Sequence, residues 1–486
     1  MLSIYLRSAI IFTYVAYLLI FPSGLFGQTK VSLSKNKLRV IEFIERHQTQ
    51  LITWSDEVWK FAEPSLKENK SATLLINVLR REGFTVQENV SGMATVFVAT
   101  YGTAQPVVGL FGEYDADPNA SNKVVPRKEE LVKGGYGHGG HHNLLAIGSL
   151  GAALAIKNLI QQRRLDCTIR YYGTTAEGTV GAKTHLARDG YFDDLDFSLY
   201  WHPAPATVAS ARPWDALIDF DITFSAKKVN IIREIRGGPT TLDALEVMIG
   251  AMKNLRQQSS PGIRMNYTIR QNNVNLSEIP DTVRLSVRIQ CARQEDAREL
   301  FQKIQDAANE TGAALNVVSS VDVDRAMHQF LPNVAAMKIV QKNMELLGPM
   351  NYTDEEQKFA KEIQLALNIS DEGIQDKIPA FTDESNRQSL YGYASDIGDA
   401  SWIAPEVYFV VRTLPGVPMH QWPGTAFSAH SIGHKGMLQA SKILSMTITD
   451  FVENKSLQQS ILEDFKRSKR SYTYKSLMNS TPPACK

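Results

Sequence analysis

Cysteine is scarce in this chain of 486 residues, which holds three, at positions 167, 291 and 485. Three widely separated thiols exclude a disulfide framework of the kind that supports small secreted domains. None of the three lies near the histidine-rich stretch at residues 135–143, "GYGHGGHHN". A metal ion held by that stretch would therefore need nitrogen and oxygen ligands.

An excess of charge of either sign is also missing. The chain has 52 basic and 51 acidic residues, so its formal net charge is +1. This balance argues against a dominant basic surface, and nucleic acid is not expected as a partner. The hydrophobic content of 43% argues against wholesale disorder. A chain of this length is too long for one ordinary domain, so two domains are the default expectation.

No segment after the N-terminus is expected to span a membrane, and at the N-terminus residues 8–21 form an apolar run after a positive charge at Arg7. The run is shorter than the ~20 residues that a membrane span needs, and Pro22 then breaks it. We therefore expect residues 1–27 to be a signal peptide, with an uncleaved membrane anchor as the alternative. Either reading places the protein outside the cytoplasm, as a periplasmic or extracellular protein.

Strand-like and helix-like segments alternate through the first 213 residues and again after Pro332. This alternation predicts an α/β sheet with helices on both faces. Polar residues fall where the predicted strands end, at Glu113, Asp115, Glu177 and His202. Because ligands bind at the carboxyl ends of the strands in such sheets, these side chains are expected to converge on one crevice.

A second pattern separates the two parts of this α/β unit. From about residue 215 the order is strand, helix, strand, helix and strand, which predicts a compact α+β unit. The expected division is residues 28–213 and 329–455 for the α/β domain, 214–328 for the inserted domain, and 456–486 for a basic C-terminal tail. A helix is expected after the histidine-rich stretch, with Asn143 as its N-cap.

The histidine-rich stretch alone leaves two interpretations open, a metal site or a polar glycine loop. The metal interpretation gains support when Asp115, Glu177, His202 and His434 are added from predicted strand or helix ends. Imidazole and carboxylate groups together suit zinc. A glutamate that is not a ligand suits a general base for water.

Several motifs resemble those of the metal-dependent aminoacylases and carboxypeptidases, in particular the branch of aminobenzoyl-glutamate utilization protein B. The matching stretches are "GEYDADP", "GYGHGGHHNLLAIGSLGAALAIK", "YYGTTAEGTVGAK", "ARDGYFDDLD", "WHPAP", "SDIGDASWIAP" and "SIGHKGM". They are spread over nearly the whole chain after residue 27. The resemblance implies a zinc-peptidase-like mixed sheet that is interrupted by a smaller α+β lid domain, and a homodimer formed through the lid.

The same resemblance implies roles for individual residues. It places His142, His202 and His434 as metal ligands, Asp115 as an acid that orients the site, and Glu177 as the general base. Asp396 and Asp399 match a motif that lines the same crevice. The implied reaction is hydrolysis of an amide bond between an acyl or aminobenzoyl group and an amino acid, so the expected partner is a small amino-acid conjugate.

Four departures from the family pattern affect the site. Gly140 replaces a metal-bridging cysteine, His141 replaces the next glycine, and Gly178 replaces a metal-binding glutamate. Asn230 stands where a lid histidine polarises the substrate carbonyl. Without the two anionic ligands, a pair of divalent cations would repel strongly at low dielectric. One zinc ion is therefore expected, and two are not.

The remaining histidines have open or ordinary roles. His141 could bend towards the metal through its glycine-rich loop, or it could face solvent or a backbone carbonyl. His138 is expected to shape the loop, and His420 matches a family histidine near the crevice. Ordinary surface or core positions are expected for four others, His47, His185, His328 and His430.

Two classes of function follow. The first is an exported amidohydrolase with a reduced, single-metal site, in which Asn230 donates a hydrogen bond to the developing oxyanion. The alternative is a catalytically inactive relative that binds an amino-acid conjugate or serves in a hetero-oligomer beside an active partner. Fold alone cannot choose between them.

Overall fold

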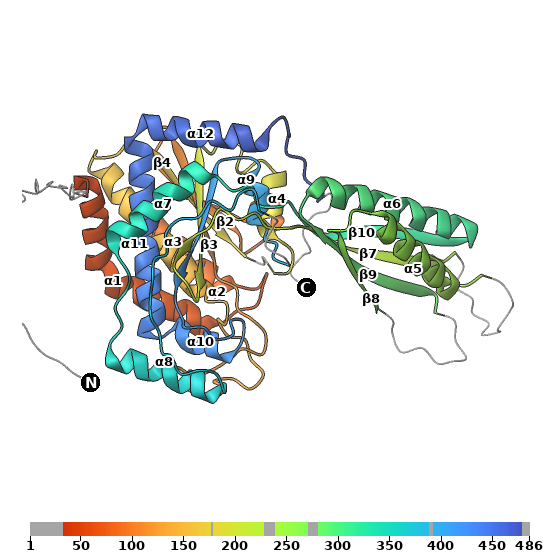
Figure 1. Cartoon of the computed structure of the whole chain (residues 1–486), viewed down its shortest axis with the longest axis horizontal. Helices are drawn as coiled ribbons and strands as arrows, with labels where there is room; N and C mark the ends of the chain where they lie inside the picture. Colours follow the sequence, from red (N-terminus) through yellow and green to blue (C-terminus); the bar gives the residue numbers. More distant parts are fainter. Residues whose placement is uncertain (1–32, 176–177, 228–238, 271–279, 388–391, 479–486) are drawn as a thin grey trace, which may run out of the picture.

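The structure is a computed structural model that describes residues 33–175, 178–227, 239–270, 280–387 and 392–478. These residues form a large α/β unit and a smaller α+β unit that projects from it (Figure 1). The predicted signal peptide, Glu177 and Asn230 lie outside the described residues.

A mixed sheet of seven strands forms the centre of the α/β unit, in the order β1-β2-β4-β3-β5-β11-β6. Strands β3, β4, β5 and β11 run parallel, whereas β1, β2 and β6 pair antiparallel with their neighbours. The strands are β1 (Thr85–Glu88), β2 (Phe97–Tyr101), β3 (Val107–Glu113), β4 (Thr168–Thr174), β5 (Phe197–Ala204), β6 (Val208–Ala209) and β11 (Glu406–Arg412). This sheet confirms the predicted α/β class. Every residue of β3 is buried, as expected for a central parallel strand covered on both faces.

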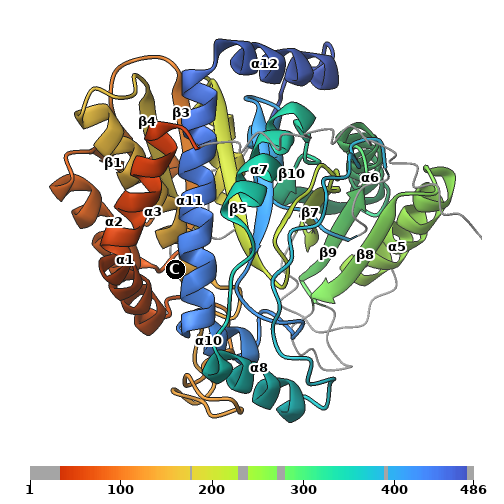
Figure 2. The ribbon, with the colours of Figure 1, turned by 60° about the vertical axis from the view of Figure 1, so that its left-hand side comes forward.

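Helices cover both faces of this sheet. Figure 1 shows α1, α3 and α11 on the side away from the smaller unit, and α4 and α9 on the side towards it. Figure 2 shows the long helix α11 standing beside α1 and α3. The helices are α1 (Lys35–Phe61), α2 (Asn69–Arg81), α3 (His142–Gln161), α4 (Ala182–Arg188), α7 (Val334–Leu347), α8 (Asp354–Ala366), α9 (Ile397–Ser401), α10 (Trp422–Ser428), α11 (Ser431–Glu453) and α12 (Lys455–Lys469), with a 3₁₀ turn η1 (Val90–Gly92).

Helix α3 packs very closely against the sheet. A Cβ atom at Gly148 would lie 2.5 Å from the ring of Trp201 on β5, so only glycine allows this approach. The contact fixes the start of α3, at His142, relative to the end of β5, at His202. Among the described residues, α3 is also the one helix long and apolar enough to cross a membrane, but 83% of its apolar window is buried in the core.

The smaller unit is an antiparallel sheet of four strands, in the order β10-β7-β9-β8, with two helices. Its strands are β7 (Ala216–Ala226), β8 (Arg264–Arg270), β9 (Thr282–Cys291) and β10 (Val317–Met327), and its helices are α5 (Thr241–Gln258) and α6 (Gln294–Ala314). Its buried side chains form a separate hydrophobic core that includes Phe220, Ile222 and Phe224. The structure therefore confirms a second, α+β unit, which we call the lid.

Three local expectations differ from the structure. Helix α3 begins at His142, and His141 is its N-cap. The side-chain amide of Asn143 instead donates to the backbone carbonyl oxygens of Ser55 and Ser428. Strand β8 was not predicted, although apolar residues alternate along it. Residues 456–469, expected to belong to a tail, lie in α12 (Lys455–Lys469), which buries Ile461 and Phe465 while Lys466 and Arg467 are exposed.

Candidate metal centre

The carboxyl ends of the parallel strands and the first turn of α3 meet at one edge of the large sheet. Glu113 is the last residue of β3, His202 lies near the end of β5, and His142 begins α3. Because β5 pairs parallel with β3, their carboxyl ends lie at the same edge. The sequence positions 113, 142 and 202 are therefore brought together by the sheet order and by the packing of α3.

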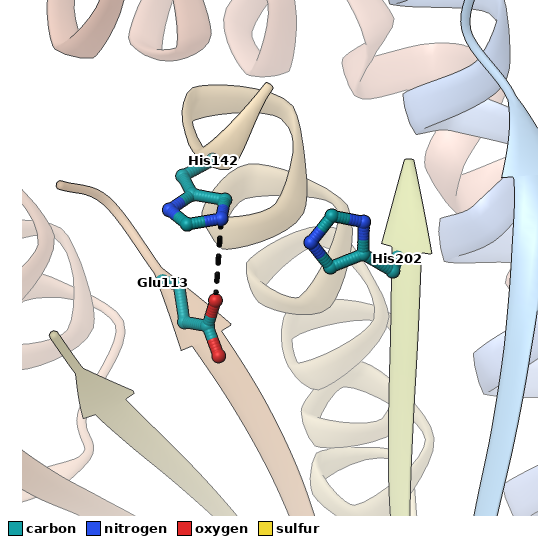
Figure 3. A group of neighbouring side chains, drawn as sticks. All are labelled: Glu113, His142 and His202. Atoms are coloured by element: carbon teal, nitrogen blue, oxygen red, sulfur yellow. Dashed lines mark ion pairs between the residues drawn. The ribbon is translucent and has the colours of Figure 1, made fainter. Parts of the chain in front are cut away.

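Glu113, His142 and His202 form a compact group of metal-ligand type (Figure 3). Each offers one ligand atom, and these atoms all lie within 4.8 Å of one another. The Nε2 atom of His142 lies 3.4 Å from Oε2 of Glu113. The two imidazole rings have centroids 5.6 Å apart and are nearly perpendicular, at 85°.

Hydrogen bonds on the far side of each ring leave one nitrogen of each histidine for the group. Nδ1 of His142 donates to Oδ1 of Asp115 over 2.8 Å, and Ser65 donates to the other Asp115 oxygen. Nδ1 of His202 donates to the carbonyl oxygen of Pro203 over 2.7 Å. Metal-binding histidines are oriented by such bonds, which fix the tautomer that presents Nε2 to the ion.

Two buried atoms of the group have no hydrogen-bond partner, namely Nε2 of His142 and Oε2 of Glu113. The two atoms face each other at 3.4 Å, beyond a good hydrogen bond, and in the metal-free protein the charge of a protonated His142 offsets that of Glu113. A closer partner is still missing for both buried atoms. A divalent cation would satisfy both. Two imidazoles and one carboxylate are a ligand set that catalytic zinc sites use, so the residues present fit a metal ion.

The charges within the group match this interpretation. Burial opposes a charge on His142, but the carboxylates of Asp115 and Glu113 raise its pKa to about 10. Burial and the charge on His142 lower the pKa of His202 to about 4. In the metal-free protein, a proton on His142 therefore supplies the positive charge that the surrounding carboxylates favour.

The structure does not bring His434 or His141 into this group. His434 lies in the first turn of α11, where its Nε2 contacts Oδ1 of Asp56 at 2.9 Å. His141 has φ 64°, and its buried ring bonds the hydroxyl of Thr413 over 2.8 Å. His141 is therefore held by Thr413 and is not one of the three residues of the group.

The surroundings of Gly140 and Gly178, which stand where the resemblance led us to expect metal ligands, differ from each other. A Cβ atom at Gly140 would lie 2.8 Å from Cε1 of His420, and the Gly140 amide donates to Asp117 over 2.7 Å. His420 in turn lies 3.1 Å from Asp117. By contrast, no atom lies within 4 Å of a Cβ built at Gly178. The cysteine position is thus crowded by His420, while the glutamate position is open.

His138 and two residues not selected from the sequence complete the description. His138 contacts the carbonyl oxygen of Val58 at 3.1 Å, which is consistent with a role in shaping the loop. Glu113 was recognised as a polar strand end but not as a ligand. Lys183, which pairs with Glu113, ends the matching stretch "YYGTTAEGTVGAK", but no role was assigned to it from the sequence.

Comparisons with known proteins agree with the resemblance seen in the motifs. No family model matches the chain. It is 28% identical over 445 residues to a component of the p-aminobenzoyl-glutamate hydrolase of Escherichia coli, covering 86% of this chain and 92% of that protein. It is 23% identical over 460 residues to human Xaa-Arg dipeptidase, covering 90% and 94%.

Solved structures show the same fold. A dinuclear metal-binding peptidase of Bacillus subtilis matches with a TM-score of 0.55 and 14% identity, over 84% of this chain and 99% of that one. An aminobenzoyl-glutamate utilization protein of Klebsiella pneumoniae matches with a TM-score of 0.53 and 12% identity, over 83% and 98%. The comparisons confirm the resemblance to metal-dependent amide hydrolases and the arrangement of an α/β domain with a lid.

Proposed function

We propose that this chain is a metal-dependent amidohydrolase that cleaves the amide bond of acyl- or aminobenzoyl-amino-acid conjugates. The observation that carries the proposal is the convergence of His142, His202 and Glu113 with unpartnered ligand atoms at one buried point. The similarity to a component of a p-aminobenzoyl-glutamate hydrolase and to a dipeptidase supports the substrate class.

The site supports one metal ion better than two. Gly140 and Gly178 offer no side-chain ligands, and the part of the chain that the structure describes contains one group of this kind. When bound, a zinc ion supplies a Lewis acid for the amide carbonyl and for water. Asp115 and the Pro203 carbonyl hold the two rings in the tautomer that points Nε2 at the ion.

Proton transfer is assigned to Glu177 on its place in the sequence. Glu177 stands two positions after Thr175, which is the first residue beyond β4. The buried Thr175 hydroxyl donates a hydrogen bond to Glu68. In the proposed reaction, the Glu177 carboxylate takes a proton from the attacking water and passes it to the leaving amine. Asn230 of the lid donates a hydrogen bond to the carbonyl oxygen as negative charge develops there.

A measurement of metal content together with an amidase assay tests the proposal. Purified protein is expected to hold about one zinc per chain, a stoichiometry based on the three-ligand catalytic sites of other enzymes, and to hydrolyse p-aminobenzoyl-glutamate or a dipeptide. Glu177→Gln is expected to abolish turnover while keeping the metal. A chain that neither binds zinc nor turns over any member of a panel of such amides would contradict the proposal.

A second candidate function is a binding protein without catalysis. The observation that favours it is the absence of side-chain ligands at positions 140 and 178, where the family places cysteine and glutamate. It predicts that the conjugate binds with the same affinity in Glu177→Gln and in the unchanged chain, and that neither hydrolyses it.

We further propose that the protein is exported and forms a homodimer through the lid. Export is supported by the apolar run at residues 8–21. Dimerisation is supported by β8, an edge strand of the lid sheet that leaves Tyr267 and Ile269 exposed. Cell fractionation and light scattering of the purified chain test the two statements, and a cytoplasmic monomer would contradict both.

A further inference from the structure

Next to the candidate metal centre lies a lysine with no exposed surface. Lys183, in the first turn of α4, places its Nζ atom 2.6 Å from Oε1 of Glu113 and 2.6 Å from Oδ1 of Asp396. The side chains of all three residues are 0% exposed. Oδ2 of Asp396 also accepts the backbone N–H of Lys183 over 2.9 Å, so the lysine is held at two points.

The two oxygens of Glu113 have different surroundings. Oε1 accepts hydrogen bonds from the Lys183 ammonium and from the Tyr200 hydroxyl, the latter over 3.0 Å. Oε2 has no hydrogen-bond partner and faces Nε2 of His142. The carboxylate is thus anchored through one oxygen, and its plane is set so that the other oxygen points into the group with the two histidines.

Taking these three charges out of water has a large cost, and a purely structural contact could be replaced by apolar side chains of similar volume. The presence of these buried charges is explained if Glu113 must present a charged oxygen to a cation. One ammonium faces two carboxylates, Glu113 and Asp396, at equal distances, so one negative charge remains to be matched at the centre.

We propose that Lys183 is a positioning residue of the metal centre, which holds Oε1 of Glu113 so that Oε2 serves as the anionic metal ligand. In this role Glu113 supplies negative charge that the site lacks at Gly140 and Gly178. The inference rests on the proposed function, because it requires that His142, His202 and Glu113 bind a metal ion. Tyr200 acts in the same direction with a weaker, neutral hydrogen bond.

The chain offers a matched control in a second buried lysine. Lys37 in α1 is 4% exposed, and its Nζ contacts Asn343 at 2.8 Å and Asp450 at 2.6 Å. Neither partner belongs to the metal centre. Lys183→Met and Lys37→Met therefore each remove one buried ammonium that is bonded to carboxylate, and only the first touches Glu113.

The test is zinc titration of the full chain by calorimetry, with Co²⁺ absorption as a spectroscopic measure of ligand geometry. Lys183→Met is expected to weaken zinc binding by about 10- to 100-fold, the usual effect of removing a residue that orients a ligand, and to change the Co²⁺ spectrum. Lys37→Met is expected to leave both unchanged. Circular dichroism and thermal melting identify the temperatures at which each variant is folded.

A double variant separates positioning from simple charge balance. Lys183→Met with Asp396→Asn removes both members of the ion pair, so a pure balancing role predicts recovery of zinc affinity. The positioning role predicts that affinity stays low, because nothing replaces the Lys183 bond to Glu113. If Lys183→Met does not fold, Tyr200→Phe provides the test, and a smaller loss of affinity in the same direction is expected.

The outcomes distinguish this inference from the proposed function. Zinc binding by the unchanged chain, with affinity and Co²⁺ spectrum unaltered in Lys183→Met, would overturn the positioning role and leave the metal centre standing. Recovery of full affinity in the double variant would also overturn it. No zinc binding by the unchanged chain would overturn the metal centre, and the role of Lys183 with it.

Discussion

Two buried histidine–aspartate pairs of nearly equal geometry stand in different parts of the molecule. At the sheet edge, Nδ1 of His142 lies 2.8 Å from Oδ1 of Asp115. Where the lid joins the large domain, Nδ1 of His328 lies 2.9 Å from Oδ1 of Asp399. Both rings are buried, and in both pairs the aspartate fixes the ring.

The difference lies in the second ring nitrogen. Nε2 of His328 bonds the hydroxyl of Tyr472 over 2.9 Å and lies 3.4 Å from the Arg298 guanidinium. Nε2 of His142 has no hydrogen-bond partner and faces a carboxylate oxygen. The second nitrogen of His328 is used by protein groups, whereas that of His142 is buried and faces a carboxylate oxygen beside a second imidazole, which is the arrangement that a metal ligand requires.

The His328 pair has a structural task at the junction. His328 directly follows β10, the last strand of the lid, and Asp399 lies in α9 of the large domain. The C-terminal segment adds to this contact, because the Tyr474 hydroxyl donates to Asp399 over 2.7 Å. Met478, beyond it, is buried in the lid core. The segment thus connects the lid to the large domain.

The largest expected effect is on metal binding. His142→Ala removes a proposed ligand and is expected to weaken zinc binding by more than about 100-fold, whereas His328→Ala is expected to leave zinc affinity within about twofold. Calorimetric titration of the two variants measures this difference. Equal losses in both would show that the two pairs do not differ in the way described.

Stability of the metal-free protein is expected to depend on both histidines. His328→Ala leaves the buried Asp399 carboxylate with fewer hydrogen bonds and is expected to lower the free energy of unfolding by about 3 kcal/mol. His142→Ala is expected to cost at least as much, because it takes the protonated imidazole away from the carboxylates of Asp115 and Glu113. Urea denaturation of both variants without zinc gives the comparison, and a clearly smaller loss for His142→Ala would contradict it.

The pH dependence of metal binding tests the charge assigned to His142. Despite burial, carboxylates raise the pKa of His142 to about 10 in the metal-free protein, so zinc must displace its proton at neutral pH. Deprotonation favours binding, and the apparent dissociation constant is expected to fall about tenfold per pH unit between pH 7 and 9. Titrations in buffers of different ionisation enthalpy would detect release of about one proton. An affinity independent of pH over this range would contradict the charge assignment.

The smallest effect is expected at His434. Its Nε2 atom contacts Asp56 and lies outside the group, so His434→Asn is expected to change zinc affinity by less than about twofold. Loss of zinc binding in this variant would restore the ligand set that the sequence motifs suggested.

Much of the fold could be predicted because its signals are local. The alternation of strands and helices gives the large sheet, and the change of pattern near residue 215 gives the lid. Edge strand β8 escaped prediction because its side chains are mostly exposed, so its alternation was not read as a buried face. Helix α12 was not predicted, because the segment is rich in basic residues and buries few apolar ones.

The candidate site was only partly accessible from sequence. His142 and His202 were selected and do lie together, since strand ends and helix starts predict convergence. Glu113 and Lys183 are 70 positions apart, and Lys183 and Asp396 are 213 apart, so their pairing depends on tertiary structure that no local pattern reports. His434 was selected from its motif, but that motif begins a helix whose first turn packs against α1 instead.

The most direct test of the central claim is anomalous diffraction at the zinc edge from crystals of the full chain grown with zinc. The account predicts one peak, bonded at about 2.0–2.2 Å to Nε2 of His142, Nε2 of His202 and Oε2 of Glu113. A peak bonded to His434 or His141 in place of Glu113, or two peaks at this edge of the sheet, would contradict it.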